Sequence, residues 1–321
     1  MTAVDKGQGD RHARGGELLV HLARETHQYA GRVSEAVRDC WAEWLDHRRF
    51  GGDAEVKDRF LEELRRTRDK VLDNATLAPR ETLLDVGCGD GLIGFGALER
   101  GAGEVVFSDV SEDLLDTCRS LARGLGVLDR CRFLQASGDD LSDIEDASVD
   151  VVTTRSVLIY VDRKREAFAE FFRLLREGGR VSLFEPINRL NRFQRAFDAA
   201  EVQELEDRVK AVFDHLQPQD SDPMMNFDDR DLVDLAEGEG FGEVHLELHV
   251  EVKPPEPIRW EAYSNLAFNP KIPTIAEAME QVLTAEERAL YEAHMRPLVE
   301  EGRGSRRMAS AYLRAVKTPA S

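Results

Sequence analysis

The sequence predicts an α/β fold in which helices cover both faces of a doubly wound, mostly parallel sheet. Two observations predict it. From residue 81 to about residue 186, short apolar runs typical of buried strands alternate with helical patterns. Within this region the residues Leu83 to Gly91 read LLDVGCGDG, in which the end of a strand runs into three glycines at alternate positions. A strand, a glycine turn and a helix start together form a cradle for a nucleotide.

Short strand–helix units account for the alternation. The expected strands are Thr82–Val86, Glu104–Ser108, Arg132–Gln135, Val149–Thr153 and Arg180–Phe184. The expected helices are Gly91–Arg100, Glu112–Leu125 and Arg163–Arg176, and Glu177-Gly178-Gly179 is expected to end the last helix and turn into the fifth strand. Ligands on such sheets bind beyond the carboxyl ends of the strands, so the residues that follow each strand are the site candidates.

The segments on either side of this region are expected to be mostly helical. Residues 1–15 are polar and glycine-rich and are expected to form a disordered tail, followed by a helical N-terminal lid over residues 16–78. Residues 79–321 are expected to form one domain with helical insertions at about 187–227 and 255–300.

Two further strands are expected near the end of the chain. In VHLELHV, from Val244 to Val250, apolar and polar residues alternate, which is typical of a half-exposed strand. The segment RRMASAYLRAV, from Arg306 to Val316, also has strand character. A helical pattern runs between them from Thr274 to Glu300.

Bulk properties narrow the class of protein. The 321 residues carry a formal net charge of −19, and so acidic a surface repels nucleic acid and anionic lipid. The four cysteines have neither metal-binding spacing nor the density of a disulfide scaffold, so no metal is expected. The N-terminus lacks the apolar segment of a secretory signal, and no stretch is long enough to span a membrane, so the protein is expected to be cytoplasmic.

Two cofactors compete for the glycine cradle. Gly89, Gly91 and Gly94 satisfy the dinucleotide pattern Gly-x-Gly-x-x-Gly, and Asp109 follows Gly89 by about 20 residues, where a ribose-binding acid is expected. This favours a nicotinamide dinucleotide. Against it, Asp85 lies immediately before the turn, where a carboxylate suits a cationic group better than a pyrophosphate. The C-terminal part also does not read as a second nucleotide-binding half.

The sequence resembles the class I S-adenosylmethionine-dependent methyltransferases. LLDVGCGDG is similar to the first motif of that family, and the similarity continues through VVFSDVS, LQASGDDL and the segment from Ser148 to Pro186. The resemblance covers residues 79–186 well and the last strands more loosely. It implies a Rossmann-like sheet of seven strands, mostly parallel with an antiparallel last strand, and S-adenosylmethionine as the cofactor, with S-adenosylhomocysteine as the product.

The resemblance also implies residues that bind the cofactor. Asp85 is expected near its ammonium group, and the ribose hydroxyls are expected at Asp109, with Val110 packed on the adenine. The adenine amino group is expected at Asp139, or at Ser137 if the loop has a different register. The cofactor-binding residues that the resemblance implies are Asp85, Gly87, Cys88, Gly89, Gly91, Asp109, Val110, Ser137, Gly138, Asp139 and Arg155. We expect Cys88 to pack rather than to act as a nucleophile.

Candidates for the acceptor side follow the fourth and fifth strands. Tyr160 and Arg155 are the catalytic candidates: Tyr160 to orient the acceptor or act as a weak base, and Arg155 to hold a carboxylate of cofactor or acceptor. Substrate-binding candidates are Tyr160, Glu185, Asn188, Arg189 and, from the N-terminal helices, Tyr29.

The sequence therefore predicts methyl transfer from S-adenosylmethionine to a small molecule in an enclosed pocket, without nucleic acid or membrane as partner. Two alternatives stay open. One is a nicotinamide-dependent oxidoreductase. The other is a protein that binds S-adenosylmethionine without transferring methyl, either a sensor or an enzyme that cyclises the cofactor. The sequence does not indicate the identity of the acceptor, the atom that is methylated or the oligomeric state.

Overall fold

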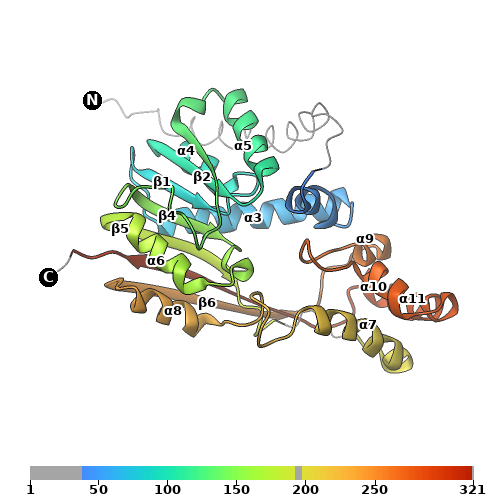
Figure 1. Cartoon of the computed structure of the whole chain (residues 1–321). Coiled ribbons are helices and arrows are strands. Elements are labelled where there is room, and N and C mark those ends of the chain that lie inside the picture. The colour runs from blue at the N-terminus through green and yellow to red at the C-terminus, as the bar shows by residue number, and fades with distance from the viewer. Residues whose placement is uncertain (1–37, 192–196, 320–321) are drawn as a thin grey trace, which may run out of the picture.

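The computed structural model describes residues 38–191 and 197–319, and a seven-stranded sheet organises them (Figure 1). The strands are β1 (Thr82–Val86), β2 (Glu104–Asp109), β3 (Cys131–Gln135), β4 (Val149–Arg155), β5 (Leu175–Pro186), β6 (Glu243–Lys253) and β7 (Arg306–Val316). Their order across the sheet is β3-β2-β1-β4-β5-β7-β6. The first five strands pair in parallel, and β7 pairs antiparallel with β5 and β6. The predicted Rossmann-like sheet with an antiparallel last strand is confirmed.

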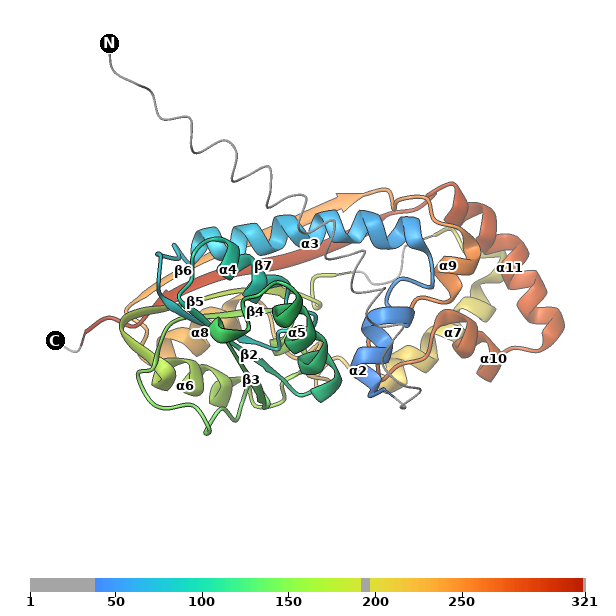
Figure 2. The same cartoon turned by 90° about the horizontal axis from the view of Figure 1, so that it is seen from above.

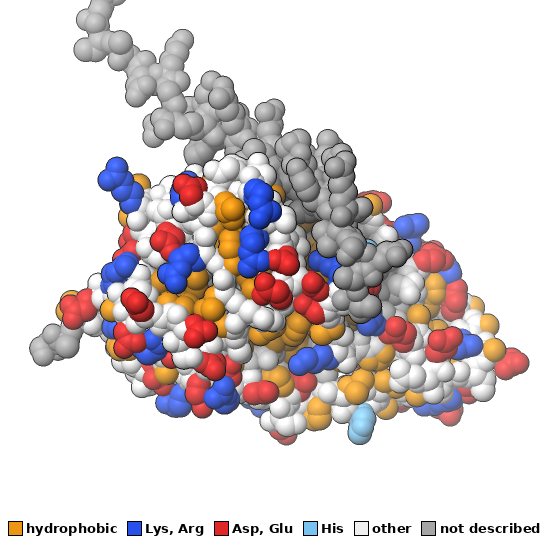
Figure 3. Space-filling model, turned by 45° about the horizontal axis from the view of Figure 1, so that its top comes forward, with side chains coloured by type: hydrophobic (Ala, Val, Ile, Leu, Met, Phe, Trp, Pro, Cys, Tyr) orange, Lys and Arg blue, Asp and Glu red, His pale blue; other side chains and the backbone are white. Residues whose placement is uncertain are grey.

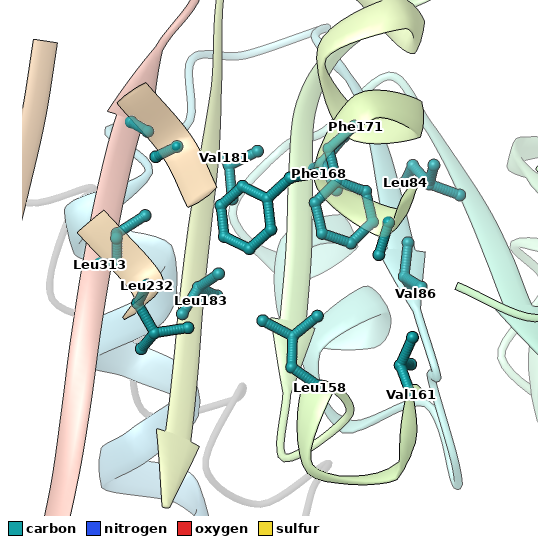
Figure 4. Packing of buried hydrophobic residues seen from close by; sticks show 14 of the residues in the cluster. Leu84, Val86, Leu158, Val161, Phe168, Phe171, Val181, Leu183, Leu232 and Leu313 are labelled. Atoms are coloured by element: carbon teal, nitrogen blue, oxygen red, sulfur yellow. The ribbon is translucent and has the colours of Figure 1, made fainter. Parts of the chain in front are cut away.

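Helices cover both faces of the sheet. The second half of α3 (Ala54–Asn74) packs on one face together with α4 (Leu92–Glu99) and α5 (Glu112–Gly124), through buried residues such as Leu72 and Phe95. On the other face lie α6 (Lys164–Leu174) and α8 (Asp229–Gly238). Figure 4 shows Phe168 and Phe171 of α6 packed toward the strand side chains.

A second hydrophobic core lies beyond the end of the sheet. It is built from α7 (Gln203–Leu216), α9 (Trp260–Ser264), α10 (Ile275–Val282), α11 (Ala285–Glu300) and the short turn η4 (Ala200–Val202). We call residues 199–216 and 258–300 the helical lobe. Helix α3 runs alongside both parts (Figure 2), because Val56 near its start packs in the helical lobe and Leu72 near its end packs on the sheet.

Several short helical elements precede or follow the longer helices and strands. Ahead of α3, the helix α2 (Cys40–Glu43) continues into a π-helical turn, η1 (Trp44–Arg48). The side chain of Asp53 caps the start of α3 by accepting hydrogen bonds from Glu55 N and Val56 N. Single 3-10 turns, η2 (Leu128–Arg130) and η3 (Leu158–Tyr160), precede β3 and follow β4.

Several expected element boundaries differ from the structure. Helix α6 ends at Leu174, and β5 already begins at Leu175, which is buried and pairs with Val149. The expected glycine turn is therefore an irregularity inside β5, where Gly178 has φ of +77°. Residues 187–199, expected to be helical, show only a turn and irregular backbone in the part described.

The helical pattern from Thr274 to Glu300 is two helices rather than one. Thr274 and Thr284 each begin a new helix with a reciprocal capping box, formed with Glu277 and Glu287. Helix α9 lies within the helical insertion expected at about 255–300, ahead of the helical pattern that begins at Thr274.

The expected disordered tail and the first third of the expected N-terminal lid, residues 16–37, lie outside the described residues. Within the described ranges, no helix is both long and apolar enough to cross a membrane. On the face shown in Figure 3, acidic and basic side chains are interspersed, so the net charge of −19 does not gather into one acidic patch there.

Candidate functional site

The glycine loop between β1 and α4 opens onto a large cavity. Gly87, Gly89 and Gly91 all have positive φ angles, of +62°, +56° and +83°. A Cβ on Gly87 would lie 2.4 Å from the side chain of Val157, so this position has no room for a side chain. A Cβ on Gly89 would meet nothing within 4 Å, because this residue faces open space. Gly87 and Gly89 line the cavity, and the backbone there is free to approach a ligand.

Asp109, at the end of β2, lies beside the loop. Its carboxylate accepts hydrogen bonds from Gly89 N at 2.8 Å and from Ser111 N at 3.0 Å. Burial raises the pKa of Asp109, and the nearby carboxylate of Asp39 raises it further. Asp109 also lines the cavity, and a carboxylate that accepts two hydrogen bonds keeps acceptor capacity for two more. This arrangement fits a ribose diol, whose hydroxyls would donate to it.

Asp85 does not line the cavity, contrary to the expectation that it contacts the cofactor's ammonium group. Its carboxylate is buried beneath the loop and accepts hydrogen bonds from Gly94 N at 2.9 Å and from the Thr153 hydroxyl at 3.1 Å. Burial raises the pKa of Asp85 to about 7, although these hydrogen bonds act in the opposite direction. The geometry gives Asp85 the role of fixing the first turn of α4 against β4.

Glu185 is likewise absent from the cavity wall where it was expected. It is fully buried in β5 and accepts hydrogen bonds from three successive backbone N–H groups, those of Val157, Leu158 and Ile159, at 2.9, 3.0 and 3.3 Å. Burial raises the pKa of Glu185 to about 7. This carboxylate therefore holds the loop after β4 in place from beneath the cavity wall.

The segment after β3 contributes Ser137 and Gly138 to the cavity wall, but not Asp139. The Asp139 carboxylate accepts a hydrogen bond from the Ser137 hydroxyl and forms an ion pair with Arg163 at 3.0 Å. Of the two options for the adenine, this geometry favours the Ser137 register.

Two other residues of the glycine loop that were expected to bind the cofactor lie behind the cavity wall. Cys88 and Gly91 do not line the cavity. Cys88 is buried, and burial raises the pKa of its thiol well above its usual value, which disfavours the thiolate. A Cβ on Gly91 would lie 2.5 Å from the ring of Phe95, so this glycine serves the packing of the loop on α4.

Arg155, the last residue of β4, and Tyr160, in the loop that follows, both line the cavity, as expected from the sequence. Between them Ser156 adopts a φ of +57°, an uncommon conformation for a residue with a side chain. Tyr160 packs edge-on against Trp41 with ring centroids 4.9 Å apart. Burial raises the pKa of Tyr160 to about 12, which excludes the phenolate as a base at neutral pH.

Arg49, which the sequence reading missed, lies in the same part of the cavity. It follows η1, and its guanidinium lies over the Trp44 ring, 5.3 Å from the centroid. Burial lowers the pKa of Arg49 to about 10, and the charge of Arg155 contributes to this shift. A sequence signal for this residue exists, because Arg49 closely follows two tryptophans, Trp41 and Trp44.

Only some of the acceptor-side candidates line the cavity. Asn188 lines the cavity and is buried, and its Oδ1 accepts a hydrogen bond from Asn191 Nδ2 at 3.0 Å. Asn188 Nδ2 has no hydrogen-bond partner among the described residues. Arg189 does not line the cavity and lies 3.7 Å from Asp220. Tyr29 lies outside the described residues.

The cavity extends far beyond the glycine loop. Its volume is about 1100 Å³, and its walls come from the sheet, from α3 and from the helical lobe. Away from the loop the wall is mainly apolar and aromatic. This part is lined by Trp41, Leu45, Phe60, Leu64, Phe184, Met224, Leu248, Val250, Ile258, Tyr263, Leu266, Phe268, Met308 and Tyr312.

Comparison with known proteins shows what this fold and site are similar to. Residues 84–183 match a family model described as a methyltransferase domain. The matched residues lie within the part of the chain that resembles the class I S-adenosylmethionine-dependent methyltransferases.

Particular relatives place it more closely. It is 31% identical over 179 residues to the ubiquinone/menaquinone biosynthesis C-methyltransferase UbiE of Stutzerimonas stutzeri, covering 54% of this chain and 65% of that protein. It is 30% identical over 116 residues to the tRNA 5-carboxymethoxyuridine methyltransferase of Escherichia coli, covering 36% of this chain and 43% of that protein. The chain thus spans less than two thirds of these curated relatives.

Among solved structures, the YcgJ protein of Bacillus subtilis superposes with a TM-score of 0.51 at 16% identity. The superposition covers 79% of this chain and 99% of that one. This likeness supports the fold of the domain.

Proposed function

We propose that this chain transfers a methyl group from S-adenosylmethionine to a small molecule bound in the cavity. The observation that carries the proposal is the junction of two features: the glycine loop with Asp109 opens directly onto a cavity of about 1100 Å³. Ligand pockets typically occupy roughly 300–1,000 Å³, so the cavity has room for a cofactor and an acceptor side by side.

The residues of the loop end of the cavity suit S-adenosylmethionine. Gly89 faces open space, so the methionine part of the cofactor can lie against the backbone there. Asp109 would accept hydrogen bonds from the ribose hydroxyls, and the exposed side chain of Val110 would pack on the adenine. Ser137 and Gly138 would face the adenine edge. When bound, S-adenosylmethionine supplies a methyl group activated by a positively charged sulfur.

The chain's own contribution to the reaction is alignment and exclusion of water. The aromatic side chains of Trp41, Phe60 and Tyr263 bring the N-terminal helices and the helical lobe against the cavity. Tyr160 points its ring edge-on at Trp41 and orients the acceptor as a neutral phenol.

The alternatives are less well supported. The match to a methyltransferase family model and the antiparallel β7 favour methyl transfer over nicotinamide chemistry. One curated relative acts on tRNA, so the comparisons leave nucleic acid open as a partner. The net charge of −19 and the apolar cavity wall support a small acceptor instead. A role as sensor or in cofactor cyclisation would not need so large an apolar space beside the loop.

Equilibrium dialysis of the full chain against labelled S-adenosylmethionine and against NADH tests the donor. We expect retention of S-adenosylmethionine alone. Retention of NADH without S-adenosylmethionine would refute the proposal. Incubation with S-adenosylmethionine and a mixture of apolar acceptors should then release S-adenosylhomocysteine, whereas methylthioadenosine as the product would assign the chain to cofactor cyclisation.

A further inference from the structure

We propose that the acceptor is an apolar molecule that binds as an anion, with an ionised oxygen held between Arg49 and Arg155. The ionised oxygen belongs to a carboxylate or to an acidic enol or phenol. The inference rests on the proposed function, because it concerns the acceptor end of the same cavity. Four observations on the chain carry it.

The first observation is a pair of cations that form no ion pair among the described residues. Arg49 and Arg155 both line the cavity, close enough for the charge of one to affect the pKa of the other. By contrast, the buried Arg180 and the half-buried Arg173 pair with Glu81 and Glu170. The Arg49 guanidinium contacts the Trp44 and Phe50 rings. Partly desolvated guanidinium groups that lack carboxylates favour an anionic ligand.

The second observation concerns Tyr160 and Glu185, two described groups near these cations, neither of which is a free base. Tyr160 is a neutral phenol with a pKa of about 12, and the buried Glu185 already accepts three backbone hydrogen bonds. An anionic acceptor needs no base. Its lone pair forms the new bond to the methyl carbon, while the electron pair of the broken carbon–sulfur bond stays on sulfur, so no proton has to move.

The third observation is the charge balance. S-adenosylmethionine carries a sulfonium and an ammonium against one carboxylate, so it brings a net positive charge into the cavity. Even if the cofactor's carboxylate, Asp109 in the cavity wall and Asp90, whose charge acts on Arg49, each offset one positive charge, the two guanidiniums, the sulfonium and the ammonium would leave one positive charge in excess. Unbalanced charge in a poorly hydrated site is costly, and an anionic acceptor removes the excess.

The fourth observation concerns the body of the acceptor. The wall beyond the arginines is aromatic and aliphatic, with Phe184, Met308 and Tyr312 on the sheet side and Leu266 on the lobe side. The buried Asn188 Nδ2 lacks a partner and offers a hydrogen bond to a second oxygen of the acceptor. The acceptor therefore combines an anionic end with a hydrophobic body.

Calorimetry with a matched set of probes tests the inference. We would titrate 2-naphthoate, 2-naphthylmethanol and 2-naphthylmethylammonium into the full chain saturated with S-adenosylhomocysteine. One charge-assisted hydrogen bond corresponds to about tenfold in affinity, so 2-naphthoate should bind at least ~10-fold more tightly than the neutral probe. Arg155→Gln and Arg49→Gln should each reduce this preference to about threefold or less.

Arg48→Gln is the control. It removes the same charge one residue earlier, from a side chain that pairs with Glu277 and does not line the cavity, so it should keep the preference for 2-naphthoate. Equal binding of the three probes by the native chain would overturn the inference while leaving the proposed function intact.

A second result would also overturn it. If Arg155→Gln and Arg49→Gln weakened S-adenosylhomocysteine but not methylthioadenosine, and kept the probe preference, the arginines would hold the cofactor's carboxylate. If the native chain failed to bind S-adenosylhomocysteine at all, the proposed function itself would fail.

Discussion

Two carboxylates beneath the cavity show how single residues can support this site without lining the cavity. Asp85 and Glu185 lie at the ends of β1 and β5, the positions from which a sequence reading expects direct contact. Both turn inward and accept hydrogen bonds from the backbone of the neighbouring loop. Asp85 was predicted to matter from its place before the glycine turn and Glu185 from its place at the end of the fifth strand. The direction of each side chain could not be predicted, because it depends on packing that no linear pattern contains.

The raised pKa of Asp85 predicts a pH-dependent stability. The folded-state pKa is about 7 and the ordinary value is about 4, so the folded protein binds more protons than the unfolded chain between these values. The protonated form contributes stability that is present in full below about pH 4 and lost as the pH rises through 7. Asp85→Asn removes this titration.

Relative to the native protein, the free energy of unfolding of Asp85→Asn should therefore rise between about pH 4 and 7, by at most about 1.4 kcal/mol per pH unit. Urea unfolding at several pH values measures this difference. Asp143→Asn, an exposed change, should follow the native curve. A pH-independent difference between Asp85→Asn and the native protein would show that Asp85 does not titrate in this range.

At the scale of elements, the loop from Ser156 to Tyr160 is held by one side chain. Three of its backbone N–H groups donate to Glu185, and its entry at Ser156 has a left-handed φ. The cavity residues Arg155 and Tyr160 lie at the two ends of this loop. Their placement therefore depends on a carboxylate from the adjacent strand.

Glu185→Ala should destabilise the protein by about 2–4 kcal/mol, because it leaves buried N–H groups without an acceptor. Urea unfolding measures the loss. Glu185→Gln keeps one acceptor oxygen and should lose less, and the exposed Glu177→Ala should stay within about 0.5 kcal/mol of the native protein. A loss for Glu185→Ala no larger than for Glu177→Ala would contradict the role of Glu185 as the anchor of the loop.

Elements with a clear local signal were predicted well from sequence. The glycine motif and the strands β1 and β7 are each specified by a few adjacent residues. The prediction failed where pairing with a distant strand, or a single capping residue within a longer pattern, determines where an element begins. The start of β5 depends on pairing between Leu175 and Val149, and the break at Thr284 depends on a cap that interrupts an otherwise continuous helical pattern.

At the scale of the whole molecule, the site exists because two hydrophobic cores are joined by one long helix. Helix α3 packs in the helical lobe through Val56 and on the sheet through Leu72. The cavity lies between these cores, so its wall combines residues as distant in sequence as Trp41 and Tyr312. The cofactor end could be predicted because it is contiguous in sequence. The acceptor end could be predicted only in part: Arg155, Tyr160 and Asn188 were expected from the strands they follow, whereas Arg49 reaches the cavity only through the tertiary fold.

The central claim is that the glycine loop and Asp109 bind the methyl donor. Calorimetric titration of S-adenosylhomocysteine into the native chain, Asp109→Ala and Asp139→Ala tests it most directly. Asp109 lines the cavity, whereas Asp139 pairs with Arg163. We predict that Asp109→Ala weakens binding by more than ~1.5 kcal/mol, the scale of a lost charge-assisted hydrogen bond, and that Asp139→Ala weakens it by less. Unchanged affinity in Asp109→Ala, with the protein folded, would contradict the account.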